Sequence, residues 1–295
     1  MNPVIGIDLG GTRIKCVVFS DKGELLSKQT QDFDSNQALD WCRCIESITQ
    51  KILSEFEIKD VRIGLSAPGL VAKNQRSISH MPGRLQGLEG LDWTELLNSQ
   101  YPVKVINDAQ AALMGEVWQG VAKGMTNVIM ITLGTGVGGA AMVDGHLLKG
   151  HLGRAGHLGH ISLKIDGPPD ICRTPGSLEW AMGNYSIKER SQGRFESTHH
   201  LIEATRQGDD FAKNIWHQSI QYLATGLTSL INVLDPESIL IGGGIAESDK
   251  ALFQPLQEAL NEVEWIVHNT PVKILKATLG EYAGAYGAAC LAMKD

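Results

Sequence analysis

Two short loops in this chain contain the residue types that bind phosphate groups. One is Gly10-Gly11-Thr12 near the start, and the other is Gly134-Thr135-Gly136 near the middle. Glycine lets backbone N–H groups approach an anion closely, and threonine adds a hydroxyl donor. Either loop alone could be an ordinary tight turn, but two loops that each contain threonine favour phosphate binding. We therefore expect two halves of the chain to close on one polyphosphate.

A carboxylate also stands where chemistry could take place. Asn107-Asp108 lies between the short apolar segment 103–106 and a run of small residues that begins at Ala109. A carboxylate at the start of a helix can either cap that helix or act on a ligand. Position alone favours the cap for Asp108.

Histidine and cysteine residues raise the question of a metal site. Four histidines fall within residues 145–160, and most isolated histidines are ordinary polar residues rather than ligands. They are His146, His151, His157 and His160. The five cysteines are odd in number and widely scattered, which predicts reduced thiols. Cys42 and Cys44 would point to different faces of a helix and do not form a ligand pair.

The apolar patterns predict the elements that position these loops. Both glycine loops stand between apolar, β-branched runs, so each reads as a strand–loop–strand hairpin, with strands in 4–19 and 129–143. Further strands are expected at 24–30, 61–65, 103–106, 238–241 and 272–277. Helices are expected at 35–56, 109–118, 198–207, 209–234, 249–263 and 283–289.

Two of these helices consist largely of very small residues. One runs from Ala109 to Gly115 and the other from Ala283 to Ala289. Small side chains at helical spacing let two backbones pack closely. We therefore expect these helices to be a crossing pair that links two lobes.

Length and composition limit the classes of function. A chain of 295 residues can form two domains, and 43% hydrophobic with 20% charged residues is ordinary for a globular protein. The net charge of −7 and the lack of a basic stripe argue against nucleic acid and anionic membranes as partners. We see no leader segment and no membrane-spanning run, so we expect a cytoplasmic protein.

Four motifs in this order resemble the ROK family of sugar kinases, within the actin–hexokinase–heat-shock-ATPase superfamily. The motifs are Asn107-Asp108-Ala109, the segment 133–139, the segment 153–160, and Ile241-Gly242-Gly243-Gly244. The resemblance spans essentially the whole chain. It implies an α/β, two-lobed, actin-like ATPase (ribonuclease H-like) fold with an interdomain cleft. We expect a small domain of residues 1–117 completed by a C-terminal helix at 283–295, and a large domain of residues 118–282.

The resemblance also implies how ATP and Mg²⁺ would bind. The two predicted phosphate loops would hold phosphate oxygens, and a third glycine segment would flank the adenosine. Asp8 would orient Mg²⁺ through water, because that ion keeps several of its waters. The implied ATP-binding residues are Gly10, Gly11, Thr12, Thr135, Gly136, Gly242, Gly243 and Gly244.

For the sugar, the resemblance implies Asp108 as the general base and Asn107 as a ligand of a hydroxyl group. A carboxylate within hydrogen-bond reach can take the proton of a sugar hydroxyl as the new P–O bond forms. The sugar-binding residues that we assign are Gly69, Asn107, Asp108, Gly139, His157, His160 and Glu179.

The chain departs from the family pattern in its sugar-binding segments. His157 replaces a glutamate, so the pocket would offer a different set of donors and acceptors. This change could mean a different substrate or mere drift, and we favour a changed substrate. A second departure lies near Gly83, Arg84 and Gln86, where relatives place an asparagine. An Arg84 side chain that points inward would favour an anionic or larger substrate.

Another departure concerns zinc, which many relatives bind with one histidine and three cysteines. In this chain, Cys172 is the single cysteine left, and Asp170 and Ser177 occupy the other two cysteine positions. His160, Asp170 and Cys172 could bind a metal in principle, but a structural zinc site needs four good ligands. We therefore expect no zinc site.

We conclude from the sequence that an ATP-dependent sugar kinase is the best hypothesis. It would act on a hexose, an N-acetylhexosamine or a glycoside, and we expect a homodimer. A catalytically weak sugar-binding regulator is the alternative that His157 keeps open. Related repressors carry a helix-turn-helix domain before the kinase-like part. Because the first expected strand begins at Val4, we expect no such domain here.

Overall fold

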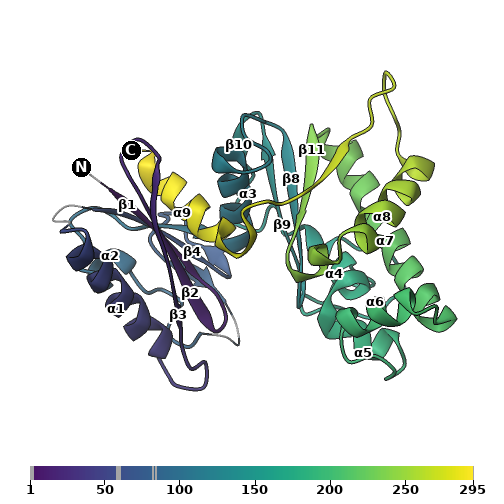
Figure 1. Cartoon of the computed structure of the whole chain (residues 1–295), viewed down its shortest axis with the longest axis horizontal. Coiled ribbons are helices and arrows are strands. Elements are labelled where there is room, and N and C mark those ends of the chain that lie inside the picture. Colours follow the sequence, from purple (N-terminus) through teal and green to yellow (C-terminus); the bar gives the residue numbers. More distant parts are fainter. Residues whose placement is uncertain (1–2, 58–60, 82, 84, 295) are drawn as a thin grey trace. The chain divides into compact units, whose positions relative to one another are not determined.

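The structure is a computed structural model that describes residues 3–57, 61–81, 83 and 85–294. The chain divides into two compact units, each built on its own five-stranded sheet (Figure 1). The first unit contains Met1–Gly124, Lys149–Ala155 and Leu279–Asp295. The second unit contains Met125–Leu148 and Gly156–Thr278. This mixed α/β architecture with two sheets confirms the fold class predicted from the sequence.

The sheet of the first unit has the strand order β3-β2-β1-β4-β7. Its strands are β1 (Val4–Leu9), β2 (Arg13–Phe19), β3 (Leu25–Asp32), β4 (Arg62–Ala67) and β7 (Lys104–Asn107). The β1–β2–β3 meander is antiparallel, whereas β1, β4 and β7 run parallel to one another. The carboxyl ends of β1, β4 and β7 therefore meet at one edge of the sheet.

Successive residues of β1 pack on opposite faces of this sheet. Ile5 and Ile7 join the core beneath helix α1 (Asp40–Glu55), whereas Val4 joins a smaller cluster beneath helix α9 (Ala283–Met293). This alternation is the period-two pattern of a strand buried on both faces. The helix expected at 35–56 begins only at Asp40, because the preceding segment forms turns in which Asp40 accepts a hydrogen bond from the N–H of Asp34 at 2.9 Å.

Helix α9 packs directly against backbone. A Cβ atom on Gly6 or Gly64 would lie about 2 Å from carbonyl oxygens of α9, and one on Gly287 would lie 1.8 Å from the carbonyl oxygen of Ala111. Ala111 belongs to helix α3 (Asp108–Gln119). The predicted crossing pair of small-residue helices is therefore α3 and α9, and both belong to the first unit (Figure 1).

The second unit has a sheet of order β10-β9-β8-β11-β12. Its strands are β8 (Val128–Leu133), β9 (Val137–Val143), β10 (His146–Leu147), β11 (Ser238–Gly242) and β12 (Lys273–Lys276). Strands β8, β11 and β12 are parallel, and β8–β9 is the hairpin predicted around the second glycine loop.

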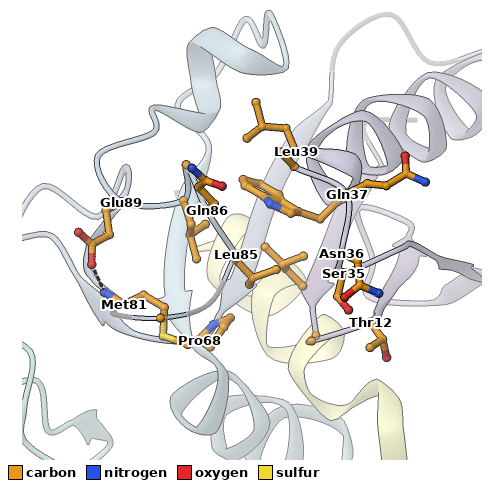
Figure 2. Close-up of a pocket in the computed structure, with 18 of the residues that line it drawn as sticks. Thr12, Ser35, Asn36, Gln37, Leu39, Pro68, Met81, Leu85, Gln86 and Glu89 are labelled. Atoms are coloured by element: carbon orange, nitrogen blue, oxygen red, sulfur yellow. Dashed lines mark hydrogen bonds between the residues drawn. The ribbon is translucent and has the colours of Figure 1, made fainter.

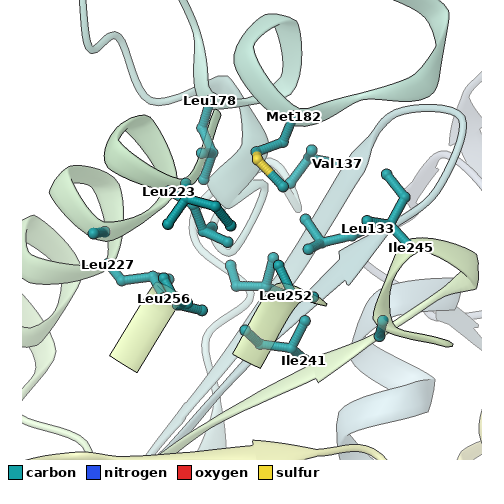
Figure 3. Close-up of a cluster of buried hydrophobic side chains, with 14 of the residues drawn as sticks. Leu133, Val137, Leu178, Met182, Leu223, Leu227, Ile241, Ile245, Leu252 and Leu256 are labelled. Atoms are coloured by element: carbon teal, nitrogen blue, oxygen red, sulfur yellow. The ribbon is translucent and has the colours of Figure 1, made fainter. Parts of the chain in front are cut away.

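Long helices cover this sheet and form the larger core. Leucines of α7 (Asp210–Leu234) and α8 (Lys250–Val263) meet apolar side chains of the sheet, as Figure 3 shows for Leu223 and Leu252 beside Ile241 and Leu133. The remaining helices of this unit are α4 (Leu178–Met182), α5 (Ile187–Arg190) and α6 (Thr198–Arg206), with 3₁₀ turns η1 (Leu158–His160), η2 (Asn184–Ser186) and η3 (Gly244–Ser248).

Short elements complete the first unit: β5 (Leu70–Val71), β6 (Ile78–His80), α2 (Trp93–Leu96) and η4 (Gly280–Tyr282). Among the residues that the structure describes, no helix has the length and apolar character needed to span a bilayer.

Candidate functional site

In the first unit, the residues predicted to do chemistry follow the carboxyl ends of its parallel strands. Asp8 of β1 is in register with Ser66 of β4, and Ala67 of β4 is in register with Asn107 of β7. The glycine loop 10–12, the turn at Pro68 and Asp108 therefore emerge at one edge of the sheet. Ligands bind at this edge in open α/β sheets.

A cavity of about 1020 Å³ lies at this edge. It is lined by Gly10, Gly11, Thr12, Pro68 and Asp108, together with residues 35–39, 41, 81, 83 and 85–89 of the same unit. Figure 2 shows Thr12, Pro68 and Leu85 around this space. Gly83 and Gln86 also line it, and Arg84 lies outside the described residues. The cavity thus joins the first phosphate loop to the predicted catalytic carboxylate.

Asp108 is exposed in this cavity, and the capping role favoured by its position belongs instead to Asn107. Asn107 Oδ1 accepts hydrogen bonds from the N–H groups of Ala109 at 3.1 Å and Gln110 at 3.3 Å. Its Nδ2 donates to the carbonyl oxygen of Gly69 at 3.1 Å, so its side chain also ties α3 to the turn after β4. Asp108 Oδ1 lies 2.8 Å from the N–H of Ala109. The positive end of α3 therefore faces the carboxylate without Asp108 being the cap.

Asp8 lies deeper at the same edge. Burial raises the pKa of Asp8 from its ordinary 3.8 to about 6, and the nearby Asp108 adds to the rise, against the opposing effects of Ser66 and Lys15. Ser66 Oγ donates to Asp8 Oδ1 at 2.6 Å. Because two carboxyl groups here disfavour each other's negative charge, the donor set suits a divalent cation such as Mg²⁺.

In the second unit, the two other predicted ATP-binding segments lie side by side. They follow β8 and β11, which are parallel neighbours with Gly242 in register with Thr132. Gly243 has a φ of +86°, and a Cβ on it would lie 2.4 Å from the carbonyl oxygen of Leu133. Only glycine allows this approach. Thr135 and Gly244 are exposed next to this contact.

Backbone hydrogen bonds fix the second predicted phosphate loop. The N–H groups of Asn184 and Tyr185 donate to the carbonyl oxygens of Gly134 and Thr135, both at 3.0 Å. The loop is therefore fixed through its carbonyl groups. This arrangement is consistent with a loop whose N–H groups bind an anion.

Three of the predicted sugar-binding residues come together in the second unit. The Glu179 carboxylate lies beneath the phosphate loop, where Oε1 is 3.3 Å from the N–H of Val137 and a Cβ on Gly136 would lie 2.3 Å from it. His160 Nδ1 is 3.8 Å from Glu179 Oε2. The rings of His157 and His160 are stacked, with centroids 6.3 Å apart and an interplanar angle of 16°.

Two other assigned glycines have structural reasons to be glycine. Gly69 has a φ of +101°, and a Cβ on it would lie 2.7 Å from the carbonyl oxygen of His80. Gly139 is buried, and a Cβ on it would lie 2.7 Å from the Cβ of Leu158. Gly139 therefore allows η1 to pack on β9, a role that the sequence did not reveal.

The four histidines of segment 145–160 do not form one cluster. His146 lies in β10, with Nδ1 2.7 Å from the carbonyl oxygen of Asp144, and His151 belongs to the first unit. His160 instead meets Asp170 and Cys172, and the candidate ligand atoms of these three residues lie within 4.8 Å of one another.

These three residues supply three of the four good ligands that a structural zinc site needs. His160 Nδ1 is hydrogen-bonded to Asp170 Oδ2 at 2.8 Å, and Asp170 Oδ1 accepts from the N–H groups of Cys172 and Thr174. Burial raises the pKa of the Cys172 thiol, and the charges of Asp170 and Glu179 raise it further. Serine occupies the fourth place, and it is a poor zinc ligand.

Known proteins of similar sequence identify the family of this chain. The sequence profile of the ROK family matches residues 4–295. The chain belongs to the ROK family. Its ROK relatives include a glucokinase of Thermotoga maritima, 30% identical over 311 aligned positions that cover 98% of this chain and 96% of the relative. An N-acetylmannosamine kinase of Vibrio cholerae is 30% identical over 268 positions that cover 90% of this chain and 91% of the relative.

A solved ROK structure also resembles the whole chain. The glucokinase of Streptomyces griseus in complex with glucose and AMPPNP has a TM-score of 0.80 and 27% identity, and the alignment covers 100% of both chains. The family predicted from the four motifs is thereby confirmed.

Proposed function

We propose that this chain is an ATP-dependent sugar kinase that transfers the γ-phosphoryl group of ATP to a sugar hydroxyl. One observation supports this function most directly. The exposed carboxylate of Asp108 and the phosphate loop Gly10–Thr12 line the same cavity. A general base beside a phosphate-binding loop is the minimum that a phosphoryl transfer to an alcohol requires.

In this proposal, Asp108 accepts the proton of the attacking hydroxyl as its oxygen bonds to the γ-phosphorus and ADP leaves. Asn107 fixes the start of α3, so the Asp108 carboxylate stays at the edge of the sheet where the parallel strands end. Most of the acceleration would come from alignment of the reactants and from neutralisation of the phosphate charge.

Asp8 would hold Mg²⁺, which would supply that neutralisation when bound. The site fits this role because Asp8 is a desolvated carboxyl whose raised pKa reflects an unfavourable charge, and a cation would relieve it. Ser66 fixes one oxygen of Asp8 by hydrogen bonding, and the other oxygen would face the ion's water shell.

In the second unit, the adjacent segments 134–136 and 242–244 would bind ATP, and Glu179, His160 and His157 would bind the sugar. In the first unit, Gly10–Thr12 would bind phosphate oxygens, and Asp108 would act on the sugar hydroxyl. We propose that the two compact units correspond to the two domains of the kinase.

The names of the relatives support two kinds of acceptor, a neutral hexose and an N-acetylhexosamine. A glycoside is the third class that the sequence leaves open. His157 stands where relatives have glutamate and is the residue expected to choose among them. A catalytically weak sugar-binding regulator remains the second candidate because of this substitution. The exposed Asp108 argues against it, since a binder needs no base.

We also propose a homodimer in the cytoplasm. Trp265, Ile266 and Val267 are exposed by 75%, 40% and 46% at one tip of the second unit, and exposed apolar clusters of this kind mark contact surfaces. ATP as phosphoryl donor and the free thiols of all five cysteines fit the reducing, ATP-containing cytoplasm.

An ADP-release assay over neutral hexoses, N-acetylhexosamines and β-glucosides tests the function. We expect sugar-dependent ADP release for at least one class, with a phosphorylated sugar as the second product. Sugar binding without any phosphorylated product would favour the regulator instead.

A further inference from the structure

Asp170 is the centre of a small hydrogen-bond network that the proposed reaction does not yet use. Its side chain is fully buried. One oxygen, Oδ2, lies 2.8 Å from His160 Nδ1, and the other, Oδ1, accepts from the N–H groups of Cys172 at 2.8 Å and Thr174 at 3.0 Å. Ser177 adds a side-chain hydrogen bond. The carboxylate therefore joins η1 to both ends of the segment 170–177.

The backbone of this segment closes around the same carboxylate. The N–H of Asp170 donates to the carbonyl oxygen of Thr174 at 3.0 Å, and the N–H of Arg173 donates to the carbonyl oxygen of Asp170 at 2.9 Å. Pro169 and Pro175 form a β-bridge across the base of the turn. The segment is thus a closed loop whose interior is occupied by one carboxylate.

Both oxygens of Asp170 lie next to donors, since Oδ1 accepts from two backbone N–H groups and Oδ2 lies 2.8 Å from His160 Nδ1. Burial disfavours the charged form, but the hydrogen bonds from His160, Thr174 and Ser177 outweigh it and lower the pKa of the carboxyl. An ionised carboxylate only accepts hydrogen bonds, so the proton of this pair lies on His160 Nδ1. In the neutral imidazole, Nε2 then has a lone pair and acts as an acceptor.

We propose that Asp170 is a positioning residue of the sugar site. It fixes the ring of His160, so that Nε2 is the atom offered to a sugar hydroxyl, and it closes the loop 170–177 without a metal. The inference rests on the proposed sugar kinase function. It also rests on the contacts of Asp170 with His160, Cys172 and Thr174.

The geometry of the ring supports this role. Of the two ring nitrogens of His160, Nδ1 faces Asp170 and Glu179, which are both acidic, whereas Nε2 faces the thiol of Cys172 at 3.6 Å. A thiol is a weak hydrogen-bond partner, and a sugar hydroxyl can replace it at little cost. The ring of His157 lies next to that of His160, with centroids 6.3 Å apart.

The test compares Asp170→Asn with a matched control, Asp166→Asn, in the purified full-length kinase. Asp166 is a carboxylate four residues away that is 74% exposed and only 3.8 Å from Lys164. The asparagine at 170 keeps an acceptor for the loop N–H groups but can donate to Nδ1, which moves the ring proton to Nε2. We expect KM for the sugar to rise roughly tenfold or more, as for a lost hydrogen bond to substrate, with KM for ATP unchanged. The control should leave both constants unchanged.

Nitrogen-detected NMR of the imidazole groups gives a readout that a purely structural role would not change. The His160 signals, identified by their loss in His160→Gln, should report the Nδ1–H tautomer in the wild type and the Nε2–H tautomer in Asp170→Asn. The wild-type spectrum alone tests the assignment if the Asp170→Asn variant does not fold. An Nε2–H tautomer in the wild type would overturn the proposal.

Two further results would also overturn it. One is an active Asp170→Asn variant whose KM for the sugar equals that of the wild type. The other is one tightly bound zinc per chain by elemental analysis, with removal by a zinc-selective chelator lowering Tm. A wild type without any sugar phosphorylation would refute the kinase function, whereas the NMR result would still stand or fall independently.

Discussion

Replacing Asp8 by asparagine should stabilise the protein at neutral pH while it impairs the proposed reaction. The reason is the raised pKa of Asp8, from 3.8 to about 6, caused mainly by burial. Below pH ~4 the group is neutral in both the folded and the unfolded chain. Between pH ~4 and ~6 it ionises in the unfolded chain alone, so the folded state loses stability as the pH rises. Above pH ~6 the loss is complete.

The magnitude follows from the size of the shift. A rise of about two pKa units corresponds to ~3 kcal/mol at ~1.4 kcal/mol per unit. Asp8 is only partly buried by its exposed surface area. Solvent therefore screens its charge and reduces this figure, and we expect ~1–3 kcal/mol. Asparagine has nearly the same shape, keeps an oxygen that can accept from Ser66, and has no charge to desolvate.

The assay is urea unfolding of the wild type and Asp8→Asn at pH 4, 5.5 and 7.5, without nucleotide or divalent cation. The difference in unfolding free energy should be near zero at pH 4 and reach ~1–3 kcal/mol in favour of the variant at pH 7.5, with an unchanged m-value. Asp21→Asn, in the exposed turn after β2, is the control and should not show this trend. A variant that is less stable than the wild type at pH 7.5 would refute the reasoning.

Two other predictions concern packing and specificity. Gly287→Ala should destabilise the first unit by ~1–3 kcal/mol or more, because the new Cβ would lie 1.8 Å from the carbonyl oxygen of Ala111. The control is Gly11→Ala, whose Cβ would meet nothing within 4 Å and which should leave Tm unchanged. Equal thermal shifts for both variants would contradict the close packing of α3 and α9. His157→Glu should change the ranking of sugars by kcat/KM, by roughly tenfold per altered hydrogen bond; a uniform gain with the same ranking would instead indicate drift.

The elements were predictable where one physical pattern dominated. The hairpins at 4–19 and 129–143 show apolar β-branched runs on both sides of glycine, and few other structures fit that pattern. The pairing of α3 with α9 followed from residue size, since large side chains would not allow Gly287 to approach backbone. The start of α1 was predicted at residue 35, but the helix begins at Asp40. A polar segment before a helix can either extend the helix or form turns, and the sequence does not distinguish the two.

The site was less predictable, because its details depend on contacts between distant segments. The sequence favoured Asp108 as the cap of α3, whereas Asn107 is the cap and also binds the carbonyl oxygen of the distant Gly69. The hydrogen bond from Ser66 to Asp8 joins residues 58 positions apart, and no local pattern indicates it. The hydrogen-bond network of Asp170 was not predicted, because the sequence pattern indicated Asp170 only as a possible metal ligand.

The central claim is that Asp108 is the general base of a sugar kinase, and single-turnover transfer from γ-labelled ATP tests it most directly. On the best acceptor sugar, Asp108→Asn should slow formation of the labelled sugar phosphate by ~10²–10⁴-fold. Calorimetry should show that the variant still binds that sugar with nearly wild-type affinity. Transfer at the wild-type rate by Asp108→Asn would contradict the account.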